Sequence, residues 1–278
     1  MVIRLRTNIP ALIGLRNLRN ITADYATTLE RLTSGLRINR AGDDPAGLVI
    51  SNKFKVMIKG IQTATTNAQE GYSLVQLTDG ALGDIVDILQ EIRALAVQSA
   101  NDTNTSLDRN TLNNQVQELL EEIDRVASNT DFNDIKLLNG NLVNSLSFLV
   151  GANKGDIIRF GMEDTRTEAI GVANISVSTA AAASLAINDV DEALSLVEAR
   201  QGVTGVVQNR LTYAINFLSD MELYYDTARS YIEDADIAEE VVNYSLLQVL
   251  SNTATAYLAQ ANLFPGNVMN LLVFQSGG

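Results

Sequence analysis

Hydrophobic residues recur three and four positions apart along most of the chain, a spacing that places them on one face of an α-helix and is typical of coiled coils. The first stripe predicts a helix over roughly residues 8–34. It consists of Leu15, Leu18, Tyr25, Leu29, Leu32 and Leu36, with Thr22 as its polar member. Asp44 followed by Pro45 then offers an N-cap and a first-turn proline for a second helix.

The second stripe is much longer. It begins at Ile50 and keeps one register to Ala96, with Gly71 and Thr78 as weak members. This predicts a helix of more than about 50 residues, roughly 80 Å long at 1.5 Å per residue. After the polar break NDTNTSLD (101–108), a third helix is predicted that ends near SNTDFND. Its stripe is Leu112, Val116, Leu119, Ile123 and Val126.

The pattern changes at about residues 136–177, where alternating apolar residues and the turn sequence GANKGD predict a β-hairpin. Helical spacing returns beyond Thr179 for more than about 50 residues. The last helix is predicted to begin after Asp236, which can cap it, and to stop at Pro265. Its apolar face includes Leu247, Leu250 and Leu258.

These elements predict a mainly α fold, an elongated coiled-coil helical bundle with a small β-hairpin region. Neither terminal helix can bury its stripe alone in water, so the two must pair with each other, pair with copies, or stay disordered until they assemble. We expect residues 1–42 and 236–278 to form the two halves of a terminal-helix domain and residues 43–235 to form a rod domain.

Composition restricts the chemistry. The 278 residues include 20 Lys and Arg against 33 Asp and Glu, a formal charge of −13, and no His, Cys or Trp. The chain therefore lacks imidazole bases, thiolate nucleophiles, disulfides and the ligands of most zinc and haem sites. Its acidity disfavours binding to nucleic acid or to anionic membranes. Nothing here predicts an enzyme or a cofactor.

Two acidic clusters have a metal-binding interpretation. Asp43 and Asp44 could hold Mg²⁺, although helix capping beside Pro45 explains them better. The run EDADIAEE (233–240) lacks the spacing of a calcium loop and favours a helix N-terminus instead. We therefore expect no metal.

The N-terminal sequence MVIRLRTNIPALIGLRNLRN has arginines scattered among its apolar residues. It leaves no uninterrupted apolar region for a secretory signal peptide. No apolar run approaches the roughly 20 residues that span a bilayer. We expect a protein that is soluble when made and exported by another route.

Several blocks resemble bacterial flagellin. They include LERLTSGLRINRAGDDPAGLVISNKF (29–54), LLEEIDRVASNTDFNDIKLLNG (119–140), DADIAEE (234–240) and LAQANLFPGNVMNLL (258–272), in the family's order. Only about 40 residues separate the two recognisable halves, so the chain resembles a short form without the variable outer domains.

The resemblance implies a structural subunit that self-assembles into the helical flagellar filament for motility. Its N- and C-terminal helices would pair and line the lumen, and the long helices with the hairpin would form the next layer. It also implies an extracellular location, export through the flagellar type III apparatus with a chaperone, and contact with cap and hook-junction proteins. The expected assembly residues are Leu15, Leu18, Leu29, Leu32, Leu247, Leu250 and Leu258, with Arg37, Asn39, Asp43 and Asp44 in the turn.

The chain departs from the family pattern in three places. Pro10 falls early in the first helix, and Gly202 adds a second glycine near Gly205. VFQSGG (273–278) extends beyond the LL at which such chains usually finish.

The resemblance also points to two surfaces. Gln90, Arg93 and Leu95 lie in a segment similar to the one that Toll-like receptor 5 detects, but Glu91 and Gln115 replace an expected arginine and glutamate, which predicts weak receptor activation. Some flagellins are O-glycosylated, which makes Ser176, Ser178 and Thr179 candidate acceptors.

The two alternatives to a filament subunit are another structural protein and an enzyme. A hook-filament junction protein of the same superfamily shares the N-terminal blocks, whereas the C-terminal block favours flagellin. Flagellins with an inserted metallopeptidase need an H-E-x-x-H motif, and this chain has no histidine.

Overall fold

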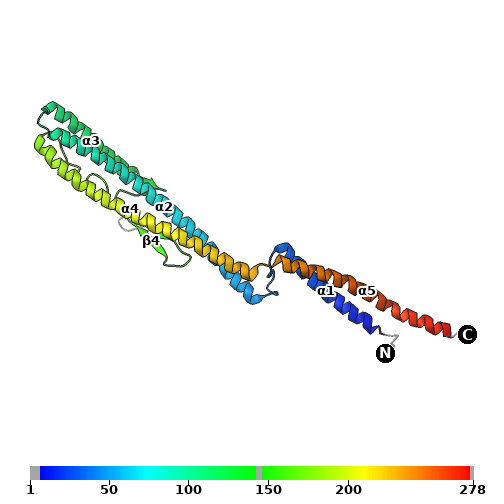
Figure 1. The fold of residues 1–278 in the computed structure, drawn as a ribbon. Helices are drawn as coiled ribbons and strands as arrows, with labels where there is room; N and C mark the ends of the chain where they lie inside the picture. Colours follow the sequence, from blue (N-terminus) through cyan, green and yellow to red (C-terminus); the bar gives the residue numbers. More distant parts are fainter. Residues whose placement is uncertain (1–6, 142–145, 276–278) are drawn as a thin grey trace. The chain divides into compact units, whose positions relative to one another are not determined.

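The structure is a computed structural model that describes residues 7–141 and 146–275. Within them it contains five helices and two antiparallel strand pairs, which confirms the mainly α fold with a small β region (Figure 1). The elements in order are α1 (Ile9–Ser34), α2 (Pro45–Ala100), α3 (Ser106–Asn129), β1 (Asp131–Phe132), β2 (Ile135–Lys136), β3 (Leu146–Leu149), β4 (Ile157–Phe160), α4 (Ala180–Glu233) and α5 (Ile237–Gln275).

The two long helices are confirmed. Helix α2 has 56 residues and α4 has 54. At 1.5 Å per residue α2 is about 84 Å long. Gly202 and Gly205 do not interrupt α4, since a helical glycine costs only about 1 kcal/mol relative to alanine. In the described ranges, none of the helices has the length and apolarity that crossing a bilayer requires.

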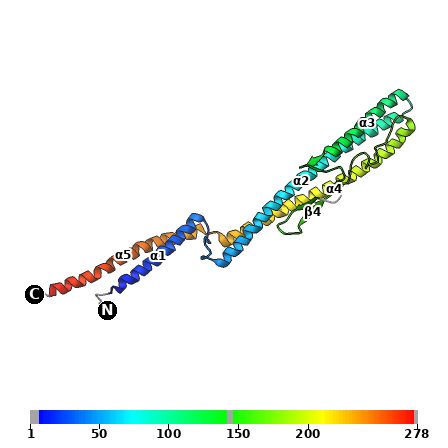
Figure 2. The ribbon, with the colours of Figure 1, turned by 180° about the vertical axis from the view of Figure 1, so that it is seen from behind.

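The chain divides into two compact units. We call residues 1–56 with 225–278 the terminal unit and residues 57–224 the central unit. In the central unit, α3 and α4 run alongside α2 (Figures 1 and 2). Their shared core includes the fully buried side chains of Val75, Leu82, Ile85, Leu89, Ile92, Val116, Ile123, Phe160, Val190, Val197 and Leu211.

The predicted hairpin is confirmed by β3 and β4, which pair from Leu146 opposite Phe160 to Leu149 opposite Ile157. It packs on α2 at Gly71, where a Cβ atom would lie 2.9 Å from the ring of Phe148. Gly71, a weak member of the heptad stripe, is therefore the position at which the hairpin approaches α2.

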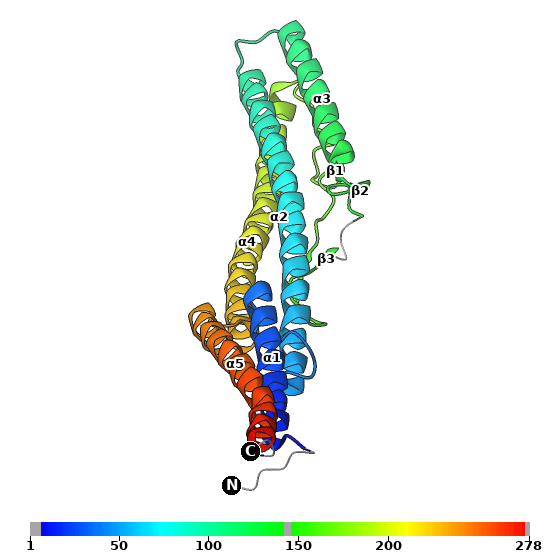
Figure 3. The same cartoon turned by 90° about the vertical axis from the view of Figure 1, so that its right-hand side faces the viewer.

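The smaller β1–β2 hairpin was not predicted; it lies beside the end of α3 (Figure 3). Asn133 and Asp134 form its two-residue turn with φ values of 52° and 65°. Asn and Asp tolerate this left-handed conformation, and the primed turns of short hairpins need it.

The prediction that Pro265 ends the last helix is wrong. Helix α5 continues through Pro265 to Gln275. A proline cannot donate a hydrogen bond to the carbonyl four residues earlier, here that of Ala261. That carbonyl instead accepts a bond from the side chain of Asn8 (2.7 Å), so it is not left unpaired. Of the VFQSGG segment, residues 276–278 lie outside the described residues.

Helix α3 starts inside the polar segment that was predicted to be a break. Thr105 is its N-cap, and Asp108 completes a capping box by accepting the backbone N–H of Thr105 (3.0 Å). The polar residues therefore begin the helix rather than separate it from α2.

Candidate functional site

Helices α1 and α5 pair with each other in the terminal unit, as predicted (Figure 1). The two hydroxyl groups of Tyr25 and Tyr244 lie 2.7 Å apart, and their rings stack at 4.9 Å. Positions advance along α1 as they recede along α5, so the pair is antiparallel in one register. The contacts in order are Asn8 with Ala261, Gly14 with Tyr257, Tyr25 with Tyr244, and Arg31 with Glu240.

Two of these contacts show why the residue types matter. A Cβ atom on Gly14 would lie 3.3 Å from the Tyr257 ring, so glycine allows the close approach of the helices. Arg31 forms an ion pair with the buried Glu240 at 3.1 Å. The hydrogen bond to the Tyr244 hydroxyl raises the pKa of Tyr25 above its ordinary value, which keeps this phenol protonated.

A short ladder joins the two turns of the terminal unit. Gly35 ends α1 with φ of 73°, a left-handed conformation suited to glycine. The backbone N–H of Arg37 donates to the carbonyl of Glu233 (2.7 Å), and that of Ala235 donates to the carbonyl of Gly35 (3.0 Å). The α1–α2 turn therefore holds the segment between α4 and α5.

Glu233 is a buried carboxylate beside this ladder. Ser51 donates a hydrogen bond to it (2.7 Å), and Lys55 forms an ion pair with it. Burial acts to raise the pKa of Glu233, but the bonds from Lys55 and Ser51 outweigh burial and the net pKa is lowered. Glu233 is therefore charged at neutral pH and ties the end of α4 to the start of α2.

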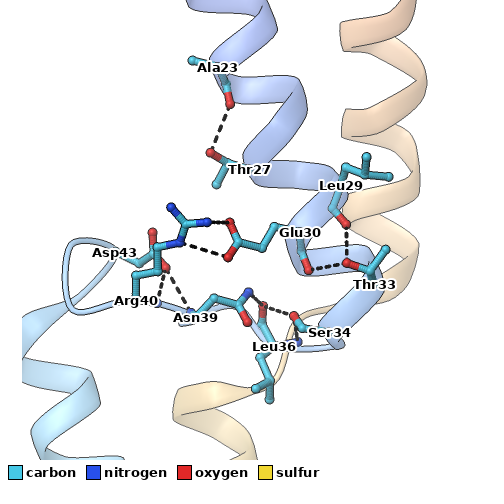
Figure 4. A network of polar contacts seen from close by, with 10 residues as sticks. All are labelled: Ala23, Thr27, Leu29, Glu30, Thr33, Ser34, Leu36, Asn39, Arg40 and Asp43. Carbon is cyan, nitrogen blue, oxygen red and sulfur yellow. Dashed lines mark hydrogen bonds and ion pairs between the residues drawn. The ribbon is translucent and has the colours of Figure 1, made fainter.

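Two of the turn residues predicted for assembly, Asn39 and Asp43, lie in one network of polar contacts (Figure 4). The Asp43 carboxylate accepts the backbone N–H groups of Asn39 (3.0 Å) and Arg40 (2.8 Å), and these bonds lower its pKa. Arg40 pairs with Glu30 at 3.0 Å. Asp44 accepts the N–H of Gly47 (2.9 Å), which confirms that it caps α2.

These contacts give Asp43 and Asp44 structural roles inside the turn. Across residues 7–141 and 146–275, three or more acidic side chains never gather in an arrangement that could hold a metal ion.

The pairing of α1 with α5 covers only part of their apolar surface. Among the side chains that the structure describes, the buried hydrophobic residues of the terminal unit are Ile38 and Ala261. Of the predicted stripe, Leu29 and Leu250 are exposed, while Leu15, Leu18, Leu32, Leu247 and Leu258 are half-buried. The other large hydrophobics exposed on α1 and α5 are Ile9, Leu12, Ile13, Ile237, Val241, Val242, Leu246, Val249, Tyr257 and Leu263.

The candidate receptor surface lies in the central unit. Gln90 is exposed, whereas Leu95 is half-buried against the core. Arg93 of α2 forms an ion pair with Asp191 of α4 at 2.6 Å. Its hydrogen bond to Asp191 raises the pKa of Arg93, and the same contact lowers the pKa of Asp191.

The candidate glycosylation residues already make local hydrogen bonds. The Ser176 hydroxyl donates to the side chain of Asn113 (3.0 Å) and accepts the N–H of Ser178 (3.4 Å). Thr179 is exposed, and its hydroxyl caps α4 by accepting the N–H of Ala182 (3.1 Å). Of the three, Thr179 is the most accessible.

Two structurally important residues escaped the sequence analysis. Asn8 bridges α1 and α5, and the buried Arg109 of α3 donates to the carbonyls of Ser99 and Asn101 at the end of α2. Asn8 could have been found as a cap directly before a helix with proline in its first turn. A buried arginine in a polar stretch carries no such local signal.

A family model described as the bacterial flagellin N-terminal helical region matches residues 5–142, and one described as the bacterial flagellin C-terminal helical region matches residues 187–272. The chain belongs to the bacterial flagellin family. It is therefore a structural subunit of the flagellar filament, and its family is one of structural proteins rather than enzymes.

Individual relatives of this chain indicate the same family. The flagellin of Halalkalibacterium halodurans is 39% identical over 95% of this chain and 98% of its own length. The flagellar filament 33 kDa core protein of Treponema phagedenis is 35% identical over 95% and 98%. The crystal structure of Bacillus cereus flagellin matches with a TM-score of 0.51 and 28% identity, over 55% of this chain and 88% of that one.

Proposed function

We propose that this flagellin-family chain polymerises by covering the exposed apolar face of its terminal unit with the same unit of neighbouring copies. The observation that carries the proposal concerns the described side chains of the terminal unit. Only two hydrophobic ones, Ile38 and Ala261, are buried, while the helices expose Leu12, Leu246 and Val249. Removing such surface from water favours association by about 25 cal/mol per Å². Identical copies in one repeated contact build an open helical polymer.

The distribution of charge between the two units also supports contact between terminal units. The terminal unit has ten basic and ten acidic residues, so its copies can pack together without net repulsion. We propose that residues 1–42 and 236–278 form the inner layer of the filament and residues 43–235 the surrounding rod. In this arrangement Arg37, Asn39, Asp43 and Asp44 shape the turn that leads from one layer to the other.

The partners follow from this role. Export through the flagellar type III apparatus with a chaperone, followed by contact with cap and hook-junction proteins, delivers the subunit to an extracellular filament. Family membership supports this route. The hydrophobic surface that α1 and α5 expose is of the kind that a chaperone would cover before assembly.

The two smaller surfaces remain predictions. The guanidinium of Arg93 is already paired with Asp191, and Leu95 is half-buried. Both side chains therefore offer less surface for a receptor to contact, which supports weak receptor activation. Strong signalling by the purified monomer in a receptor-reporter assay would contradict it. Thr179 is the best-exposed candidate for O-glycosylation, which mass spectrometry of the native filament would detect.

Seeded polymerisation tests the main proposal. Purified chain is mixed with filament fragments and examined by negative-stain electron microscopy. We expect long uniform tubes from the wild type and none from a variant carrying Leu246→Ser and Val249→Ser. Gln248→Ala is the matched control, because Gln248 is also exposed on α5 but is polar.

Two outcomes would contradict the proposal. Normal tubes from the double serine variant would show that this face is not the contact. Only short oligomers from the wild type, while a known flagellin polymerised in parallel, would favour the junction-protein alternative.

A further inference from the structure

The carbonyl of Ala261 differs from its neighbours in α5. In an α-helix each carbonyl accepts the N–H of the residue four positions later, and for Ala261 that residue is Pro265, which has no N–H. Ala261 is itself buried. A carbonyl that is shielded from water without a partner costs up to about 1–3 kcal/mol. The bond that this carbonyl makes is partly buried, so a donor from outside its own helix is favoured here.

Asn8 supplies that donor and does a second task with the same side chain. Its Nδ2 donates to the carbonyl of Ala261 (2.7 Å), while its Oδ1 accepts the N–H of Ala11 (3.1 Å) and caps α1. Ser, Thr and Asp also cap helices, but an ionised Asp has no proton to donate. The amide therefore fits both tasks at once.

We propose that Asn8 and Pro265 form a register lock that fixes how far along α5 the start of α1 is placed. Pro265 is the only proline in α5, so the carbonyl it leaves free marks a single position on that helix. Shifting α5 by one turn would move this carbonyl about 5.4 Å along the axis, beyond the reach of the Asn8 amide. A shifted register thus leaves a buried acceptor unpaired.

Packing alone does not fix the register at this end of the pair. A groove of about 490 Å³ lies between the helices beside the bond. Its lining residues include Ala11, Leu12, Leu15, Leu258 and Asn262. Because the groove leaves this end of the pair less filled, the bond adds a requirement for register here to the one that the Tyr25–Tyr244 and Arg31–Glu240 contacts impose farther along the helices.

The lock matters for assembly because the register determines which apolar residues of α1 lie beside those of α5 on the exposed face. Leu12 and Leu263, which are both exposed, belong to that face. The inference deepens the proposed function and rests on it for this consequence, although the lock itself lies within one chain.

A double-mutant cycle tests the lock. Asn8→Asp keeps the capping oxygen and removes the donor, so we expect the critical concentration for seeded polymerisation to rise about tenfold, the equivalent of one hydrogen bond. Pro265→Ala restores an N–H for the Ala261 carbonyl. In that background, Asn8→Asp should change the critical concentration by less than about threefold.

Asn17→Asp is the matched control. Asn17 is exposed on the same helix, so this variant adds the same charge without touching the bond. Equal effects of Asn8→Asp and Asn17→Asp would overturn the lock. The lock would also be overturned if Asn8→Asp raised the critical concentration equally with proline and with alanine at position 265.

Hydrogen exchange of the unpolymerised chain separates the lock from the proposed function. We expect Asn8→Asp to speed amide exchange in peptides covering residues 9–15 and 255–264, and to have no such effect in the Pro265→Ala background. Unchanged exchange in the Pro265 background would overturn the lock even where filaments form. Failure of the wild type to polymerise would count against the proposed function alone.

Discussion

The terminal and central units use the same kind of heptad-patterned helix to different ends. In the central unit the pattern is satisfied within the chain, and every member of the main core lies between Ala68 and Leu211. In the terminal unit the same pattern leaves Ile38 and Ala261 as the buried hydrophobic residues among the described side chains. A heptad stripe predicts that a helix needs a partner, but it does not say whether that partner belongs to the same chain.

Charge separates the two units as well. The central unit has 10 basic and 23 acidic residues, so it carries the whole formal charge of −13, while the terminal unit is balanced. Residues 241–278 include no charged residue at all. The charge that opposes the approach of copies therefore lies in the central unit, and the terminal unit adds no net charge to it.

Truncation should separate the units most clearly. We expect deletion of residues 1–34 or of residues 237–278 to abolish polymerisation, because each deletion leaves one terminal helix without its partner. The central unit should keep its helicity and its thermal transition, since its core lies outside both deletions. Electron microscopy and circular dichroism give the two readouts. Long filaments from either truncated chain would refute the division of roles.

A matched pair of leucine substitutions sharpens the comparison. Leu89→Ala removes a fully buried side chain of the central core and should destabilise that unit by about 2–5 kcal/mol. Leu246→Ala removes an exposed side chain of the terminal unit, so it should leave monomer stability within about 0.5 kcal/mol while raising the critical concentration. Denaturant unfolding and seeded polymerisation measure the two effects, and a reversed pattern would contradict the comparison.

Acid should loosen the terminal unit through Glu233. Its pKa is lower in the folded chain than the value of about 4.3 in an unfolded one, so its charge stabilises the fold above that pH. The stabilisation is lost as the pH falls through the folded pKa. We expect Glu233→Gln to cost about 1–3 kcal/mol at neutral pH and to weaken the acid dependence. Hydrogen exchange near residues 229–237 between pH 7 and pH 3 measures this, and identical pH profiles would contradict it.

Salt should have the smallest effect. Screening of the central unit's charge should lower the critical concentration as salt rises, while monomer unfolding changes little. Glu118→Gln with Glu121→Gln neutralises two exposed acids of α3. The change in the free energy of polymerisation between low and high salt should then be smaller by roughly 0.5 kcal/mol or less. Light scattering at several salt concentrations is sufficient. A steeper salt dependence in the neutralised variant would oppose this interpretation.

Local patterns predicted most of the helices. The heptad stripes located α1, α2 and α4 to within a few residues, and Asp44 before Pro45 marked the start of α2. These predictions succeed because caps and apolar periodicity act over a few residues of sequence. The assembly residues stay a prediction: Leu29 and Leu250 are exposed, whereas Leu15 and Leu258 are half-buried.

What escaped prediction depends on distant residues. Pro265 was expected to stop α5, but the helix continues, and the carbonyl that Pro265 leaves without its helical donor bonds to Asn8 near the other end of the chain. Arg109 caps the end of α2 from the next helix, and no local motif announces it. The Asn133–Asp134 turn was a local signal, but it lies between strands of two residues each, too short to show alternation.

The bond between Asn8 and Ala261 joins positions 253 residues apart in the sequence. Contacts across the central unit span fewer residues, 98 between Arg93 and Asp191, so we expect the helix pair to form after them. Ribosomes also make α5 after every other element described here. A chain whose synthesis stops between α4 and α5 therefore holds every residue of the central core while α1 lacks its partner helix, and on the proposed function such a chain would not join the filament.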